Sequence, residues 1–417
     1  MNRAEYMTER KCGIMLELLS PAGDYECLQS AVDYGCDAVY LGSTMFGMRA
    51  SAAKFDFDTL KKGVEYAHAK GVKVYLTCNT VPSNDEIEQL PEFIKNAYAC
   101  GIDAAIVSDI GSIALIKNTV PELDIHVSTQ AGIVNYVTAN ELYKMGANRV
   151  VLAREVDIEN IKCIRDKIPA DMDIEVFVHG AMCVSFSGRC LLSSFMVGRN
   201  ANKGECAQPC RWKYHLVEEK RPGQYYQIGE DDGGSYILNA KDMCMIEHLD
   251  KLRDAGVTSF KIEGRAKSAY YVAVVTNAYR SALDAVKNNQ PVPDWAVQEV
   301  YKVSHRQYCT GFYFNKDDAS QYYENSGYIR DYDFVGVVDG CEAGTVNITQ
   351  RNYFTVHDGL EVLSPGKKPV VLDLPYLINS KGEQTEIANR ATEKLSFKSD
   401  MVFPPHSIIR KPVDNKQ

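Results

Sequence analysis

The sequence predicts an α/β protein, namely a (β/α)8 barrel of the TIM type with a long cysteine-containing insertion between strands seven and eight, followed by a small C-terminal β-barrel domain. Three observations favour this fold. Short β-rich runs alternate with amphipathic helical stretches over roughly the first 290 residues, which is the order and size of such a barrel. Four cysteines lie close together in one glycine-rich stretch. From residue 327 onward the helical period gives way to short β runs.

Each predicted barrel strand is a short β-rich run, and most of them follow a glycine turn such as Gly71-Val. A glycine at this place typically ends the preceding helix. Helical stretches such as Phe57–Lys70 and Ile87–Cys100 fill the intervals. A doubly wound sheet is the less favoured alternative, because Ser20-Pro-Ala-Gly23 follows the first strand where a G-x-G-x-x-G loop would stand. The predicted strands are Leu16–Leu19, Ala38–Leu41, Lys73–Thr77, Ala104–Val107, Asp124–Ser128, Arg149–Ala153, Asp173–Val178 and Thr258–Ile262.

The predicted domains follow from the same patterns. The first seven strands have the spacing of single β/α units, whereas a much longer interval separates the seventh from the eighth, so we expect an insertion at the carboxyl end of the barrel strands. We predict an N-terminal extension at 1–13, the barrel at 14–290 with the insertion at about 181–245, a connecting segment at 291–326 and the β domain at 327–417. The β domain should contain strands at Phe334–Val338, Thr345–Ile348, Gly359–Val362 and Val370–Leu374.

Composition is typical of a globular protein of the cytoplasm. The chain has 417 residues, of which 45% are hydrophobic and 24% charged. The first apolar run, Ile14 to Leu19, is too short for a signal peptide or a membrane span, so we expect no membrane partner and reduced cysteines. The formal net charge of −9 argues against indiscriminate nucleic-acid binding. This net charge does not exclude a local basic surface.

The strongest chemical signal is a group of four cysteines after the seventh strand. Glycines and a proline between them allow the backbone to fold around a compact centre where four thiolates converge. Structural zinc sites usually draw on two close C-x-x-C-like pairs, and only one such pair is present, so an iron–sulfur cluster is favoured over zinc and over packed core cysteines. Four thiols suit both 2Fe–2S and 4Fe–4S clusters. The predicted ligands are Cys183, Cys190, Cys206 and Cys210, with Cys244 either a reserve ligand or a packed residue.

Polar residues follow nearly every predicted strand, where a barrel is open to substrate. We expect Arg154 and Arg265 to clamp a carboxylate or phosphate, because a guanidinium fork matches both groups. For any one of these residues a structural salt bridge or a helix cap is an equally good interpretation. The residues at the strand ends are Asn79, Ser108, Asp109, Ser128, Gln130, Arg154, Glu155, His179, Lys261, Glu263 and Arg265.

A basic strip lies within the insertion, between Ala181 and His215. One interpretation is that it offsets the negative charge of a thiolate-bound cluster. The other is that it binds RNA phosphates while neighbouring aromatic rings stack on bases. The basic residues are Arg189, Arg199, Lys203, Arg211 and Lys213, and the aromatic ones are Trp212, Tyr214, Tyr225 and Tyr226.

Several motifs resemble those of peptidase family U32, with the match spanning the whole barrel and extending into the tail. The motifs are Glu17-Leu-Leu-Ser-Pro-Ala-Gly23, Asp37-Ala-Val-Tyr-Leu-Gly42, Glu175-Val-Phe-Val-His-Gly-Ala-Met-Cys183, Ser187-Gly-Arg-Cys190, Gly204-Glu-Cys-Ala-Gln-Pro-Cys-Arg-Trp212, Ser259-Phe-Lys-Ile-Glu-Gly-Arg265 and Gly327-Tyr-Ile-Arg-Asp-Tyr-Asp-Phe-Val-Gly336. Peptidase motifs such as H-E-x-x-H and G-x-S-x-G are absent from the sequence.

The resemblance implies an oxygen-independent RNA hydroxylase that contains an iron–sulfur cluster, 4Fe–4S by expectation, at the four cysteines. The length and the extra β domain look most like the tRNA uridine hydroxylases of this family, which implies 5-hydroxyuridine at the wobble position of tRNA as product. It also implies a small carboxylate such as prephenate as donor, with a paralogue as a further partner. We expect Arg154, Arg265 and Gln130 to bind substrate, and Asp109, His179 or Glu263 to move protons. The alternatives are a hydroxylase of ribosomal RNA, a collagenase-like peptidase, and a cluster-bearing scaffold protein.

Overall fold

Eight parallel strands close into a barrel in the computed structural model, which describes residues 16–43, 45–47, 54–183, 190, 192–199, 205–212, 216–217, 225–226, 230–231, 234–235, 241–314 and 328–413. The last strand, β13, pairs in parallel with both β1 and β7, which closes the sheet. The predicted barrel is therefore confirmed. Its strands are β1 (Glu17–Ala22), β2 (Ala38–Gly42), β3 (Lys73–Cys78), β4 (Ala104–Val107), β5 (Asp124–Val127), β6 (Arg149–Val151), β7 (Asp173–Ala181) and β13 (Ser259–Ile262).

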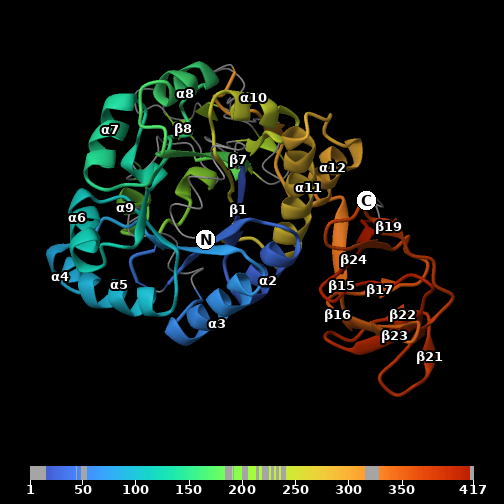
Figure 1. The fold of residues 1–417 in the computed structure, drawn as a ribbon. Coiled ribbons are helices and arrows are strands. Elements are labelled where there is room, and N and C mark those ends of the chain that lie inside the picture. Colours follow the sequence, from blue (N-terminus) through green and yellow to red (C-terminus); the bar gives the residue numbers. More distant parts are fainter. Residues whose placement is uncertain are drawn as a thin grey trace.

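Helices surround the barrel (Figure 1). Aspartates and other small polar residues begin many of them; for example, the Asp24 and Asp56 carboxylates accept backbone N–H groups of Cys27 and Thr59 at 2.9 and 2.8 Å. Such a cap satisfies one of the amides that a helix leaves unpaired at its start. The helices are α2 (Tyr25–Asp33), α3 (Phe57–His68), α4 (Asn84–Ile87), α5 (Leu90–Ala99), α6 (Ile110–Thr119), α7 (Tyr136–Lys144), α8 (Ile158–Arg165), α10 (Leu249–Asp254) and α11 (Ala269–Lys287).

The helical stretch expected over Ile87–Cys100 is present as α5, but it begins three residues later, at Leu90, and Ile87 ends the separate helix α4. Pro91 lies in the first turn of α5, where its missing N–H costs nothing. In the interior of a longer helix the same residue would remove a hydrogen bond and clash with the preceding turn. The chain therefore restarts the helix at Leu90.

The end of β7 carries additional strands that the sequence did not predict. β12 (Asp242–Cys244) pairs antiparallel with the last residues of β7, and β14 (Tyr308–Cys309) pairs in parallel with β12. This pairing explains why β7 continues to Ala181, although the predicted strand ended at Val178. The described part of the insertion between β7 and β13 also contains the short helix α9 (Leu192–Val197).

The segment after the barrel contains α12 (Asp294–Glu299) and leads to an antiparallel β domain with its own apolar core. Four β runs were predicted there, and strands occur at all four, with ends that differ by a few residues. The domain's main sheet has the order β19-β18-β24-β15-β16-β23-β20-β21. Its strands are β15 (Tyr332–Glu342), β16 (Thr345–Gln350), β18 (Glu361–Leu363), β19 (Val370–Val371), β20 (Leu377–Ile378), β21 (Gln384–Thr385), β23 (Lys394–Lys398) and β24 (Ile408–Pro412).

The β domain packs beside α11 and α12 of the barrel (Figure 1). The Arg410 guanidinium on β24 is fully buried and donates to both carboxylate oxygens of Glu299 at 2.8 and 2.7 Å. It also contacts the carboxylate of Glu361 at 2.8 Å. The Tyr34 hydroxyl of α2 donates to the carbonyl of Leu363 at 2.8 Å. These buried polar contacts fix the β domain against the barrel, because breaking them would leave charged groups unpaired. None of the helices in the described ranges is long and apolar enough to cross a bilayer.

Candidate functional site

Arg154, Glu263 and Arg265 meet at the barrel mouth, by which we mean the carboxyl ends of the eight strands. The Arg154 guanidinium lies 3.6 Å from the Glu263 carboxylate and donates to the carbonyl of Ala181 at 2.9 Å. It also lies over the ring of Phe177, 4.0 Å from its centroid. Arg154 Nε is buried and has no hydrogen-bond partner among the described residues. A buried donor without a partner is costly, so this atom suits an anionic ligand.

Arg265 belongs to the same group. Its guanidinium donates to the Thr77 hydroxyl at 2.9 Å and lies 6.0 Å from the Tyr40 ring centroid. Both partners come from strands on the other side of β1, so Arg265 reaches over the barrel interior and is only 8% exposed. Arg154 and Arg265 thus approach the mouth from two directions, as a clamp for an anion requires.

Gly180 allows the loop after β13 to approach β7 closely. Its φ is +105°, and a Cβ at this position would lie 2.5 Å from the Glu263 carbonyl oxygen. Only glycine adopts this conformation without strain and leaves the necessary space. The Glu263 N–H donates to the carbonyl of His179 at 2.8 Å. The sequence His-Gly180 therefore positions Glu263 beside Arg154.

Buried charges continue below the mouth into the barrel interior. The Lys261 ammonium donates to Glu175 at 2.6 Å and lies 4.4 Å from the Tyr40 ring centroid. Glu175 in turn contacts Arg149 at 3.1 Å, and Arg149 binds Glu17 at 2.5 Å. Burial would raise the pKa of Glu17, but the Arg149 charge and hydrogen bonds hold it at about 2. Lys261 is thus the upper end of a chain of alternating charges.

Other predicted mouth residues have structural partners. Asp109 begins α6 and accepts the backbone N–H and the hydroxyl of Ser112 at 2.7 and 2.9 Å. The Asn79 amide donates to the Ser128 hydroxyl at 3.4 Å. Gln130 is half-buried in a short 3-10 turn after β5, where its N–H donates to Ser128 at 3.3 Å. Asp109 thus acts as a helix cap, and these hydrogen bonds of Asp109 and Gln130 go to Ser112 and Ser128 and not to Arg154 or Arg265.

His179 lies outside the barrel wall, in a buried cluster with tyrosines. Its Nδ1 is 3.2 Å from the Tyr279 hydroxyl of α11, and its Nε2 is 3.4 Å from the Tyr308 hydroxyl. Burial lowers the pKa of His179 to about 3, so it is neutral at ordinary pH. The structure therefore places His179 behind β7, apart from the Arg154–Glu263 pair.

Cys244, the expected reserve ligand, belongs to this same cluster. Its sulfur is 3.7 Å from the Tyr279 hydroxyl, and burial raises the pKa of the thiol to about 11. A thiol with a raised pKa is a poor thiolate ligand. The cluster thus favours the second expectation for Cys244, a packed residue.

The four predicted cluster ligands are free cysteines. Cys183 and Cys206 are exposed, whereas Cys190 and Cys210 are half-buried. Cys206 Sγ accepts the backbone N–H of Gln208 at 3.4 Å, a contact of the kind that tunes cluster sulfurs. Within the described ranges no three side chains of His, Cys, Asp or Glu are gathered closely enough to hold a metal ion. The structure thus does not bring these four described thiols together as a ligand set, and the cluster stays a prediction from the residue types and their spacing.

The predicted basic strip is only partly described. Arg199 and Trp212 are exposed. Arg189, Lys203, Lys213 and Tyr214 lie outside the described residues, and so do the side chains of Arg211, Tyr225 and Tyr226. The RNA-binding role expected for this strip stays a prediction.

Sequence reasoning missed Tyr40, Thr77 and Phe177, which form the walls around the two arginines. A signal was available, because residues two apart on a strand face the same side. The side chains of Glu175 and Tyr75 lie in the barrel interior. Phe177 is two residues from Glu175, and Thr77 is two residues from Tyr75. Alternation along β3 and β7 could therefore have identified two of the three.

Comparison with known proteins gives a family match over most of the chain. The family model described as Peptidase family U32 matches residues 23–322, and the one described as Peptidase family U32 C-terminal domain matches residues 330–410. The two matches together cover the barrel from the end of β1 onward, the insertion and most of the β domain, so the match extends over well more than half of the chain.

Three similar proteins carry different descriptions. The chain is 36% identical over 414 residues to tRNA hydroxylation protein P of Escherichia coli, covering 89% of this chain and 91% of that protein. It is 44% identical over 317 residues to an uncharacterized protease of Methanocaldococcus jannaschii, covering 74% and 76%. It is 39% identical over 271 residues to a 23S rRNA 5-hydroxycytidine synthase of Escherichia coli, covering 65% of this chain and 40% of that protein.

Proposed function

Because the chain belongs to peptidase family U32, we propose that it hydroxylates tRNA, the activity in the name of the Escherichia coli relative that it matches over nearly its full length. One observation carries the proposal on the structural side. Arg154 presents a buried Nε without a partner in the described structure, beside Glu263, and Arg265 follows the same barrel strand as Glu263. A mouth built in this way suits a small anionic cosubstrate next to a group that moves a proton.

Arg154 and Arg265 would hold the anion, and Glu263 would accept a proton from the nucleoside. Arg154 and Arg265 bind the carboxylate of a donor such as prephenate through charge-assisted hydrogen bonds. Lys261, paired with Glu175, adds positive charge below them. Glu263, held by Arg154, would accept the C5 proton as the C–O bond at C5 forms and the C–O bond of the donor breaks. The proton then replaces the lost hydroxyl on the donor, which is reduced by two electrons as C5 is oxidised.

Cys183, Cys190, Cys206 and Cys210 would hold an iron–sulfur cluster, for which we propose the 4Fe–4S type. Bound there, the cluster supplies electron transfer that no side chain of the mouth provides. Cys183 lies two residues beyond β7, and Arg154 donates to the last residue of that strand. The protein thereby links the first ligand of the cluster to the anion clamp.

We propose the wobble uridine of tRNA as the target, which places the activity in the cytoplasm. The alignment with the tRNA hydroxylation protein extends over nearly the full length of both chains, whereas that with the rRNA synthase covers 40% of the latter. Ribosomal RNA is for this reason the second candidate. The exposed Arg199 and Trp212 lie in the insertion, where they would contact RNA.

The test is mass spectrometry of nucleosides from cells that lack endogenous uridine hydroxylation. Cells that express the native chain should contain a uridine with one additional oxygen in the tRNA fraction. Arg265→Met and Cys206→Ser should abolish the product, whereas Arg390→Gln, an exposed residue of the β domain, should not. A hydroxylated cytidine in ribosomal RNA, with unchanged tRNA, would overturn the tRNA assignment.

A peptidase is the alternative that the name of the archaeal relative raises. A protease needs an activated nucleophile or a hydrolytic metal. Cleavage of gelatin by the purified chain that survives the Cys206→Ser change, together with unchanged RNA nucleosides, would support it and contradict the hydroxylase proposal.

A further inference from the structure

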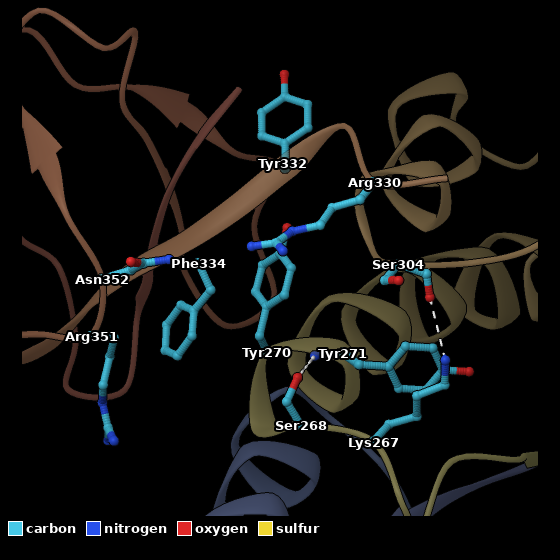
Figure 2. A pocket seen from close by; sticks show the side chains of 10 residues that line it. All are labelled: Lys267, Ser268, Tyr270, Tyr271, Ser304, Arg330, Tyr332, Phe334, Arg351 and Asn352. Carbon is cyan, nitrogen blue, oxygen red and sulfur yellow. Dashed lines mark hydrogen bonds between the residues drawn. The ribbon is translucent and has the colours of Figure 1, made fainter. Parts of the chain in front are cut away.

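A pocket of about 410 Å³ lies between the barrel and the β domain, apart from the mouth residues described above (Figure 2). The barrel contributes the loop before α11 and the first turn of that helix. The β domain contributes the start of β15 and the residues that follow β16. The lining residues are Lys267, Ser268, Tyr270, Tyr271, Ser304, Arg330, Tyr332, Phe334, Arg351 and Asn352.

The charged residues of this lining are all positive. Lys267, Arg330 and Arg351 come from three separate segments of the chain, and the lining contains no aspartate or glutamate. In Figure 2 the Arg330 side chain extends from the β domain toward Tyr270, while Lys267 and Arg351 lie on either side below. Three cations around one hollow with hydroxyl and amide groups form a binding surface for an anion.

The three cations are available to a ligand. Lys267 Nζ contacts the carbonyl of Ser304 at 3.4 Å and the rings of Tyr271 and Tyr328. Arg330 pairs with Asp333, and Arg351 pairs with Glu26 at 2.6 Å, but the two arginine side chains remain 58% and 37% exposed. Exposed ion pairs of this kind contribute little free energy. A phosphate that accepts hydrogen bonds from these arginines can therefore replace Asp333 and Glu26 at little cost.

The pocket wall is fixed before any ligand arrives. Tyr270 of α11 stacks on Phe334 of β15 with ring centroids 5.5 Å apart and an angle of 7° between the planes. Lys302 of the connecting segment binds Glu361 of the β domain at 3.0 Å. These contacts join the two domains at the pocket, so little conformational entropy is lost when an anion binds.

We infer that this interdomain pocket binds a backbone phosphate of the RNA substrate, next to the nucleotide that enters the mouth. The inference rests on the proposed function, because it assumes an RNA substrate. Each guanidinium group can donate charge-assisted hydrogen bonds to phosphate oxygens. Their exposure suits a group carried on a large polymer better than a small molecule that must be enclosed.

One loop connects the pocket to the mouth. Arg265 binds Thr77 in the barrel interior, whereas Lys267, two residues later, lines the pocket. Their Cα atoms are at most about 7 Å apart. The Lys267 N–H donates to the carbonyl of Gly264 at 2.9 Å, which fixes the turn between them. A strand of RNA bound at the pocket would therefore pass close to the loop that carries Arg265.

The test compares binding of an unmodified tRNA transcript to the full-length protein over a series of salt concentrations. Arg330→Gln combined with Arg351→Gln should weaken binding by about tenfold and make the salt dependence shallower by roughly one to two contacts. A matched control, Lys381→Gln with Arg390→Gln, removes two exposed cations of the same domain outside the pocket and should change neither. Glu26→Gln frees Arg351 and should tighten binding roughly two- to fivefold.

The outcomes separate this inference from the proposed function. If the native protein hydroxylates and binds tRNA but the double variant keeps the native affinity and salt slope, the pocket inference fails alone. It also fails if inorganic phosphate or a mononucleotide binds at the pocket while tRNA affinity is unchanged in the variant. If the native protein neither binds nor modifies RNA, the proposed function fails first. If Arg351 only supported the fold, loss of its ion pair with Glu26 would leave RNA binding unchanged or weaker. Tighter binding by Glu26→Gln would therefore exclude a purely structural role for Arg351.

Discussion

The Arg154 guanidinium lies 3.6 Å from the Glu263 carboxylate. This ion pair joins the segment after β6 to the segment after β13, across the end of β7. The same guanidinium donates to Ala181 at the end of β7. Three neighbouring strand ends are thus held by one side chain. A ligand that binds Arg154 is thereby placed beside the acid of the mouth and close to the first cysteine of the insertion.

Removal of the Arg154 charge should impair the reaction more than the fold. Arg154→Met should lower kcat/KM for the anionic donor by about 10- to 100-fold, because charge-assisted hydrogen bonds are worth about 1.5–3 kcal/mol. Steady-state kinetics with varied donor concentration measure this, with Arg390→Met as a control of equal charge change. An unchanged KM and kcat in Arg154→Met would remove Arg154 from the donor site.

The Glu17–Arg149 pair should make stability depend on acidity. The folded-state pKa of Glu17 is about 2, below the ordinary value of 4.5, so its contribution is fully present above pH 4.5 and is lost as pH falls toward 2. Glu17→Gln should therefore lower the free energy of unfolding by about 3 kcal/mol near pH 7. Urea unfolding at several pH values should show this difference shrinking below pH 4.5. A difference that stays constant down to pH 3 would contradict the assignment.

The Tyr279 hydroxyl supports the wall behind the mouth. It donates to the carbonyl of Val178 at 2.8 Å and accepts the N–H of Met245 at 3.1 Å. Tyr279→Phe removes both hydrogen bonds, but the Met245 N–H still donates to the Val178 carbonyl at 2.9 Å, so the change should destabilise the protein by about 1–2 kcal/mol. Chemical denaturation measures the effect, and the exposed Tyr98 offers a matched control, Tyr98→Phe, with no expected change. Equal stability of the two variants would show that the hydroxyl does not hold β12 on β7.

Arg410 should hold the two domains together. Arg410→Met removes the bidentate partner of the buried Glu299, which keeps only Lys302 at 3.1 Å, and should cost about 3 kcal/mol. Limited proteolysis should then cut the connecting segment faster than in the native chain. The comparison variant is Lys394→Met, which breaks an exposed pair with Asp339 and should have an effect below about 1 kcal/mol. Identical cleavage rates in all three proteins would refute a role for Arg410 at the junction.

The barrel could be predicted because its signals are local. Glycine turns and short apolar runs recur once per β/α unit, and the observed strands differ from the predicted ones mainly at their ends. The extension of β7 to Ala181 depends on its pairing with β12, which lies far away in the sequence. Such long-range pairing leaves no local pattern.

The position of His179 shows why the candidate site was harder to predict. Strict alternation along β7 would place it on the same face as Glu175 and Phe177, inside the barrel. The pairing of β7 with β13 shifts its register between Lys261 and Ile262, so that Lys261 faces Phe177 while Ile262 faces His179. A one-residue irregularity moves every later side chain to the other face. His179 consequently meets Tyr279 outside the wall.

Roles that depend on tertiary partners could not be assigned in advance either. Asp109 follows β4 as a catalytic acid would, but its carboxylate caps α6. Arg154 and Arg265 were predicted as a pair on residue type and strand position alone, and the structure brings both to the barrel mouth.

The most direct test of the account is the reaction itself with purified components. The chain is purified without oxygen and incubated with an unmodified tRNA transcript and prephenate, and the tRNA is digested for nucleoside mass spectrometry. We expect a uridine with one added oxygen, formed by the native chain and by Arg390→Gln but not by Arg265→Met. Unchanged uridine with a native chain that contains iron and sulfide in matching amounts would contradict the proposed hydroxylation.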